Sequence, residues 1–230
     1  MIEAHPAVSP SALFAVLASG LLALAAWSRL AELYRRGALA RAALALGLRF
    51  EDRAGRFIVD GPGGVTALRL GGTVGRHLVT DGRVALFEHL PHTATGSAVA
   101  GRWRPLGAAR VTGVPAFRLE ARRPGVFGLT GSVYVAADEV TLDDADDFAE
   151  RYQLYADDAD AVRALFNSAV ARFFAAHPGY CLEVRGAWLV VDEGTGPLDP
   201  ATLAGQLDAL RRIATLLETA AADARGAGLA

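Results

Sequence analysis

Residues 76–90, RHLVTDGRVALFEHL, form the clearest β-hairpin pattern in the chain. Asp81-Gly82 is a favoured pair for a two-residue turn, because glycine readily adopts the positive φ that such a turn needs. Strand-forming residues flank the pair on both sides, and a turn of this kind places Thr80 opposite Arg83. The pattern therefore predicts two antiparallel strands that are joined at Asp81-Gly82.

Alternation along these strands divides the hairpin into two faces, because successive side chains of a strand point to opposite sides of a sheet. One face carries His77, Val79, Val84, Leu86 and Glu88. The other face carries Leu78, Thr80, Ala85, Phe87 and His89. His77 and Glu88 can therefore form a polar pair, whereas His77 and His89 point to opposite sides.

Four side chains near the end of the hairpin are the candidate metal ligands of the chain: His77, Glu88, His89 and His92. Imidazole and carboxylate groups are the ligands that zinc and iron sites use. However, His77 and His89 cannot close one site without a β-bulge, and His89 with His92 supplies only two ligands. Solvated or strand-end histidines explain the same residues, so we expect no metal and no cofactor, and we assign no catalytic residue.

Other patterns that could carry chemistry are incomplete. The chain has no Gly-x-Ser-x-Gly elbow to present a serine nucleophile. The acidic run at 138–147 lacks the central glycine and closing glutamate of a calcium-binding loop. Arginines at 102, 104 and 110 surround Trp103 and could clasp a lipid phosphate or an acidic partner. A solvent loop with one packing tryptophan has the same composition.

Outward from the hairpin, short apolar stretches that end at turn residues predict further strands. They are RFIVDG (56–61), VTALRLGG (65–72), VPAFRLEAR (114–122), in which Pro115 indicates an edge strand, GSVYVAADEV (131–140), and a second hairpin, YCLEVRGAWLVVDEG (180–194). Apolar residues at helical spacing predict one helix from Asp157 or Asp158 to Ala176, and a final helix after Asp199-Pro200. The predicted fold is α+β, with an antiparallel sheet packed against helices over residues 35–222 and a disordered tail at 223–230.

The N-terminal stretch from Ser11 to Ser28 is apolar on all sides. These 18 residues contain no formal charge and would span about 27 Å as a helix, close to the hydrocarbon thickness of a bilayer. We therefore expect a short flank at 1–10 and a transmembrane helix at 11–34 that anchors the chain through Ser11–Ser28. A buried core helix is less consistent with the segment, because it has no polar face to show to water.

The flanks of this segment bear on its orientation and on the alternative of a signal peptide. A signal peptide carries Lys or Arg before its apolar core. Here the arginines follow the core, at positions 29, 35, 36 and 41, although Ala23-Leu24-Ala25 does resemble a cleavage site. The positive-inside tendency then predicts a single-pass protein of the inner (plasma) membrane, with its N-terminus outside and its domain cytoplasmic. The arginine-rich continuation, with Leu39, Ala43 and Leu46 on one face, could lie at anionic headgroups or begin the domain.

The bulk composition bounds the class of protein. Hydrophobic residues make up 52% of the chain and charged residues 21%, with a formal net charge of -2. This is a globular composition, and its near-neutral charge argues against a nucleic-acid partner. A single cysteine, Cys181, excludes an internal disulfide framework.

Three segments together resemble a group of bacterial single-span membrane proteins of unknown function. They are GGTVGRHLVTDGRVALFEH, VPAFRLEA, and CLEVRGAWLVVDEG before a terminal helix. The matching residues are Val84, Phe87 and the run 115–119, and the similarity covers about 60–220 of this chain. The chain departs from the group at Glu88-His89, where the group has Asp-Tyr. The resemblance implies a cytoplasmic α+β domain behind a membrane helix, and it implies no activity.

Two functions remain consistent with the sequence. The first is a non-enzymatic interaction or scaffolding module at the cytoplasmic membrane face, which binds a protein partner or a second copy of itself. The second is a small membrane-bound enzyme, such as a hydrolase, with an unidentified active site. The absence of a coherent nucleophile, base or metal set in the sequence favours the first.

Overall fold

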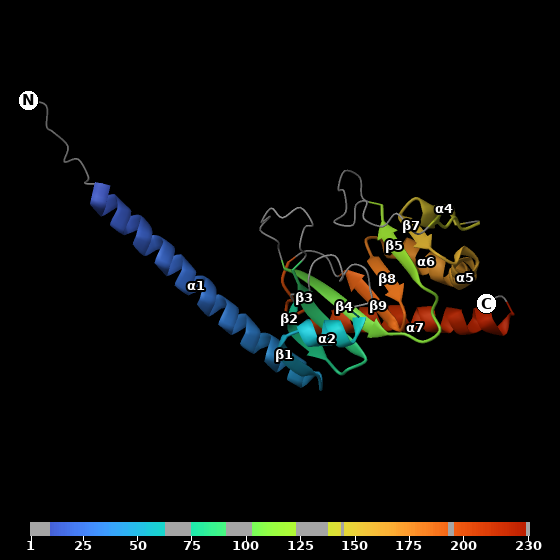
Figure 1. Cartoon of the computed structure of the whole chain (residues 1–230), viewed down its shortest axis with the longest axis horizontal. Helices are drawn as coiled ribbons and strands as arrows, with labels where there is room; N and C mark the ends of the chain where they lie inside the picture. Colours follow the sequence, from blue (N-terminus) through green and yellow to red (C-terminus); the bar gives the residue numbers. More distant parts are fainter. Residues whose placement is uncertain are drawn as a thin grey trace, which may run out of the picture.

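The computed structural model describes residues 10–62, 75–90, 103–122, 138–143, 145–192 and 196–228. Figure 1 shows one long helix that projects from an α+β body, with the N-terminus far from the body and the C-terminus at its opposite end. The fold class predicted from the sequence is confirmed.

The projecting helix, α1, runs without a break from Pro10 to Ala45. All large hydrophobic side chains that are exposed in the described part of the chain lie between Leu13 and Leu46. The helix is long and apolar enough to cross a membrane, and none of its most apolar window is buried inside the protein. A signal sequence near an N-terminus meets the same criteria of length and composition.

The second half of α1 belongs to the domain, because Leu39 and Ala43 are fully buried in the main core.

Nine antiparallel strands form one sheet in the order β1-β2-β3-β4-β9-β8-β5-β7-β6. The strands are β1 (Arg49–Arg53), β2 (Gly75–Thr80), β3 (Val84–His89), β4 (Arg104–Arg110), β5 (Phe117–Ala121), β6 (Asp138–Glu139), β7 (Tyr152–Ala156), β8 (Cys181–Arg185) and β9 (Trp188–Asp192). The second predicted hairpin is confirmed, since Arg185 pairs with Trp188.

Helices cover the sheet on both faces. The remaining helices are α2 (Gly55–Asp60), α4 (Asp146–Ala149), α5 (Ala159–Leu165), α6 (Ser168–Ala176) and α7 (Leu203–Gly226). The main core lies between one sheet face and the end of α1, α5, α6 and α7. A smaller core, centred on Ile58 and Phe87, lies under α2 on the other face. The predicted final helix is α7, and its leucine stripe is buried in the main core.

The register of the first hairpin differs from the prediction. Thr80 pairs with Ala85, so four residues separate the paired positions instead of two. The Asp81 carboxylate causes the change, because it accepts hydrogen bonds from the backbone N–H groups of Arg83 (2.8 Å) and Val84 (2.9 Å). A shift of two residues leaves every side chain on its predicted face. Val79 and Leu86 accordingly face the main core, while Ala85 and Phe87 face the smaller one.

Several other predicted elements were wrong. Residues 56–61 lie in a helix and the turn after it, not in a strand, because Ile58 reaches the smaller core from a single helical turn. The helix predicted up to Ala176 is two helices, since the Asn167 side chain caps α6 by accepting from Ala169 and Val170. β5 is an inner strand between β8 and β7, and Pro115 precedes it. Residues 65–72 lie outside the described residues.

The arginines around Trp103 do not form a solvent loop. β4 is a central strand of the sheet, between β3 and β9. Arg104 pairs with Asp192 at 2.6 Å, and the Arg110 guanidinium lies 5.6 Å from the centre of the Trp188 ring. Arg102 lies outside the described residues. The expectation of a solvent loop is therefore wrong, and the alternative of a phosphate clasp is not supported by Arg104, whose guanidinium is held by Asp192.

Candidate functional site

A buried carboxylate lies where α1 meets the sheet. Glu88, near the end of β3, is fully buried. It accepts hydrogen bonds from Arg35 Nη1 at 2.5 Å, from Arg76 Nε at 2.6 Å and from the backbone N–H of Leu198 at 2.8 Å. His77 Nδ1 lies 3.0 Å from Glu88 Oε2. Four groups from three segments of the chain, α1, β2 and the segment before α7, thus surround one carboxylate.

A second carboxylate, on α1, closes this cluster. Glu32 lies one turn before Arg35 and accepts from its Nη2 at 3.1 Å. Glu32 also pairs with Arg76 at 3.1 Å and with His77 Nε2 at 3.2 Å. We call these five residues, Glu32, Arg35, Arg76, His77 and Glu88, the junction cluster. Two carboxylates and two guanidinium groups balance in charge before the histidine is counted.

A β-bulge places His77 in the cluster. The register of β2 against β3 shifts between Arg76 and Val79, and His77 has a φ of +53°. The bulge turns the imidazole toward Glu88 and Glu32. The imidazole ring also stacks on Phe50 of β1, with ring centres 6.1 Å apart. A strained backbone at a non-glycine residue is found where surrounding contacts hold it in place.

Burial and hydrogen bonding act in opposite directions on Glu88. Burial raises the pKa of this carboxyl, but the hydrogen bonds from His77 and Arg35, the charge of Arg35 and the Leu198 N–H together hold its pKa well below the ordinary value. Glu88 is therefore ionised at neutral pH. A buried ionised carboxylate needs these partners, because removal of one partner of a buried pair is strongly destabilising.

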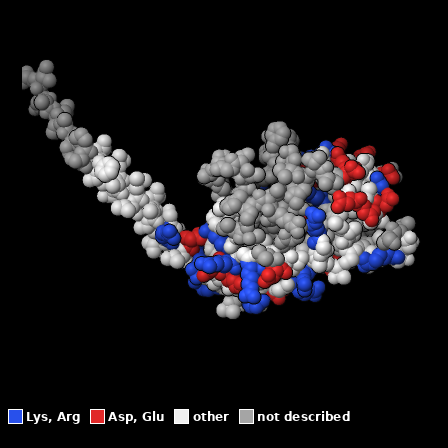
Figure 2. All heavy atoms as spheres, in the orientation of Figure 1, with Lys and Arg blue, Asp and Glu red and all other residues white. Residues whose placement is uncertain are grey.

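The ion pairs of the junction cluster fix α1 to the sheet. Each carboxylate is paired with guanidinium groups, which reduces its ability to act as a base or a metal ligand. The Arg35 guanidinium also donates to the carbonyl oxygen of Leu198 at 3.2 Å, so α1 is tied to the segment that leads into α7. Figure 2 shows that α1 is almost free of charge until it reaches this junction.

The structure brings together two of the four candidate ligands. His77 and Glu88 are in contact, as the shared face predicts. His89 is buried on the opposite face of β3 and pairs with Gly75 of β2. His92 lies outside the described residues. In the part of the chain that the structure describes, no group of three or more His, Cys, Asp or Glu side chains is arranged to hold a metal ion.

Sequence reasoning did not find the α1 half of the cluster. Arg35 and Glu32 belong to the charged flank of the apolar segment, where arginines are expected at headgroups. The one available signal was the acidic residue inside a basic flank, three positions before an arginine, which is an ion-pair spacing on a helix. Nothing in the local sequence connects Arg35 to Glu88, 53 residues later.

Comparison with known proteins supports the fold alone. No protein-family model and no curated protein sequence matches this chain. Among solved structures, the crystal structure of the mycobacterial trehalose monomycolate transport factor A, TtfA, is similar to it, with a TM-score of 0.53 and 14% sequence identity. The match covers 80% of this chain and 93% of that chain. The chain therefore shares an α+β fold with a bacterial transport factor.

Proposed function

We propose that this chain is a single-span membrane protein whose α+β domain serves as a non-enzymatic interaction or scaffolding module at the cytoplasmic face of the inner membrane. The observation that carries the proposal is the division of α1 into two parts. Its first part, from Leu13 to Trp27, carries no charged residue and exposes mainly apolar side chains. Its second part is fixed to the sheet by Arg35 and by the buried Leu39.

Because both parts belong to one unbroken helix, the anchor and the domain have a fixed orientation relative to each other. A flexible linker would let a domain move freely relative to its anchor, whereas a continuous helix sets one orientation. The junction cluster holds that orientation from the domain side. A protein built in this way presents a defined surface of its domain at a fixed height above the bilayer, which suits the binding of a partner that is itself in the membrane.

Two further points support an accessory role. The similar fold of TtfA belongs to a protein described as a transport factor, and an accessory role for this chain agrees with that description. The alternative, a membrane-bound hydrolase, receives no support from the junction cluster. Its carboxylates are neutralised by Arg35 and Arg76, and a glycosidase or metal-dependent hydrolase needs them available.

A topology experiment tests the proposal. A reporter that is active only in the cytoplasm is fused after Ala230, and membranes are separated from soluble extract. A reporter that is active only after export serves as the matched fusion. We expect a membrane-bound protein with cytoplasmic activity and an intact N-terminus by mass spectrometry. A soluble or exported product that begins after Ala25 would contradict the anchor.

A further inference from the structure

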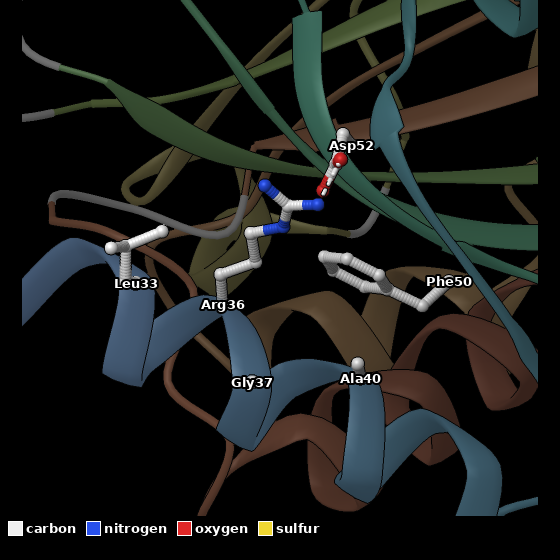
Figure 3. A pocket seen from close by; sticks show the side chains of 6 residues that line it. All are labelled: Leu33, Arg36, Gly37, Ala40, Phe50 and Asp52. Atoms are coloured by element: carbon white, nitrogen blue, oxygen red, sulfur yellow. Dashed lines mark ion pairs between the residues drawn. The ribbon is translucent and has the colours of Figure 1, made fainter.

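A shallow groove opens between α1 and β1. It has a volume of about 340 Å³ and is lined by Leu33, Arg36, Gly37 and Ala40 of α1 and by Phe50 and Asp52 of β1. Figure 3 shows Arg36 reaching across the groove to Asp52, with Leu33 at one end and Phe50 at the other. α1 and β1 are in contact, and both elements contribute residues to the lining of the groove.

The groove lies at the depth of lipid headgroups if α1 spans the bilayer as proposed. About 20 helical residues cover the roughly 30 Å of a hydrocarbon core. Counted from Leu13, where the exposed apolar residues begin, this length ends near Glu32. Leu33 then lies at the hydrocarbon boundary, and Arg36 and Gly37 lie one turn beyond it, within the headgroup layer. Trp27 and Tyr34 are both exposed on either side of this boundary, as interfacial aromatics are.

Small residues keep the groove open. Gly37 has no side chain, and a Cβ atom placed there would meet only the end of the Arg41 side chain, at 3.4 Å. Ala40 is the next residue along the same face. A Cβ atom at Gly37 meets no atom of the sheet within 4 Å, so a larger residue there can fill the groove and serves as a test.

The charges that line the groove are one cation and one anion, and both remain open to solvent. Arg36 and Asp52 form an ion pair whose side chains are 48% and 45% exposed. Each can therefore take a further partner of opposite charge. A ligand that fits this pair carries a negative group for Arg36 and a positive group for Asp52, next to an apolar part for Leu33.

We propose that this groove binds the headgroup of an aminophospholipid, with its phosphate at Arg36, its primary ammonium at Asp52 and the start of an acyl chain against Leu33. The inference rests on the proposed membrane anchoring. A glycerol headgroup offers no cation for Asp52, and a choline headgroup offers no N–H donor. A second copy of α1 fits less well, because Arg36 and Arg41 on both copies would approach each other along a parallel pair.

The experiment uses the full chain in bilayer nanodiscs that contain equal parts of phosphatidylethanolamine, phosphatidylglycerol and phosphatidylcholine, all with oleoyl chains. Native mass spectrometry then counts the lipids that stay with the protein on release. We expect phosphatidylethanolamine to be enriched about two- to fivefold over the other two lipids, the contribution of one partly exposed ion pair. Vesicle flotation of the same protein reports anchoring separately.

Three variants sharpen the result. Gly37→Leu fills the groove and should abolish the enrichment, whereas Gly20→Leu, where an added Cβ meets nothing within 4 Å, should keep it. Asp52→Asn removes the ammonium partner and frees Arg36, so the preference should turn to phosphatidylglycerol.

Equal lipid retention by the wild type and Gly37→Leu would overturn the proposal, as would a dimer that only Gly37→Leu disrupts. A protein that fails to float would overturn the membrane anchoring itself, and this inference with it.

Discussion

Arg35 on α1 donates a 2.5 Å hydrogen bond to Glu88, a fully buried carboxylate in the sheet. The two residues lie 53 positions apart in the sequence. The contact joins the only described helix that is long and apolar enough to cross a membrane to the centre of the domain. The fold therefore has no hinge at the point where an anchor and a soluble domain usually meet.

Glu88→Gln should destabilise the domain by about 3 kcal/mol, because it removes the buried anion that pairs with Arg35 and Arg76 and leaves these two partly buried guanidinium groups with the more exposed Glu32. Urea unfolding of the full chain in detergent, followed by tryptophan fluorescence, measures the change. Asp60→Asn, which breaks an exposed pair with Arg56, is the matched control and should change stability by less than about 0.5 kcal/mol. Equal effects of the two variants would show that the buried pair adds nothing.

The contribution of Glu88 should also depend on pH. Its pKa in the folded protein lies below the ordinary carboxyl value of 4.5. A lowered pKa stabilises the folded state at pH values above 4.5, and this stability is lost as the pH falls through the folded pKa. The difference in unfolding free energy between the wild type and Glu88→Gln should therefore be constant from pH 7 to pH 5 and should shrink at more acid pH. A difference that stays constant down to pH 3 would disagree with this prediction.

Leu39→Ala should test whether the second half of α1 is part of the domain. Leu39 is fully buried in the main core, and loss of a buried leucine costs about 2–5 kcal/mol. Leu44→Ala, on the exposed side of the same helix, should have almost no effect on unfolding. The same urea titration measures both variants. Similar stabilities for both would mean that this half of α1 detaches from the sheet.

Leu21→Arg should impair membrane insertion, because an arginine near the bilayer centre is unfavourable by about 2.5–3.5 kcal/mol. Leu44→Arg, about three turns beyond the groove entrance at Leu33, should insert normally although Leu44 is at least as exposed as Leu21. The fraction of protein that resists carbonate extraction measures the outcome. Extraction that responds equally to both variants would place the membrane boundary elsewhere.

Much of the fold could be predicted because its signals are local. The apolar run of α1, the alternation in β2, β3, β8 and β9, and the leucine stripe of α7 each depend on periodicity within one segment. Residues 56–61 were misassigned because six residues satisfy a strand and a helical turn equally well. The turn at Asp81 was misjudged because a side chain, not the glycine, sets its length.

The junction cluster could be predicted only in part, because most of its contacts are not local. The alternation of side chains along the two strands predicts that His77 and Glu88 share a face. Their contact also requires a β-bulge, which no pattern in the sequence predicts. Arg35 could have been assigned to headgroups or to the domain by sequence alone. Its position was decided by the packing of α1 against β1 and β2, which depends on Leu39 and Ala43 reaching the core.

Accessibility of single cysteines in intact cells distinguishes a single membrane span with a cytoplasmic domain from an exported domain. Cys181 is replaced by serine, and one cysteine is placed at Leu21, in the proposed span, or at Leu44, on the exposed face beyond it. A membrane-impermeant maleimide is added before or after the inner membrane is opened. We predict that position 21 is never labelled and that position 44 is labelled only after the inner membrane is opened. Labelling of position 44 in cells whose inner membrane is intact, or of position 21 in either state, would contradict a single span with a cytoplasmic domain.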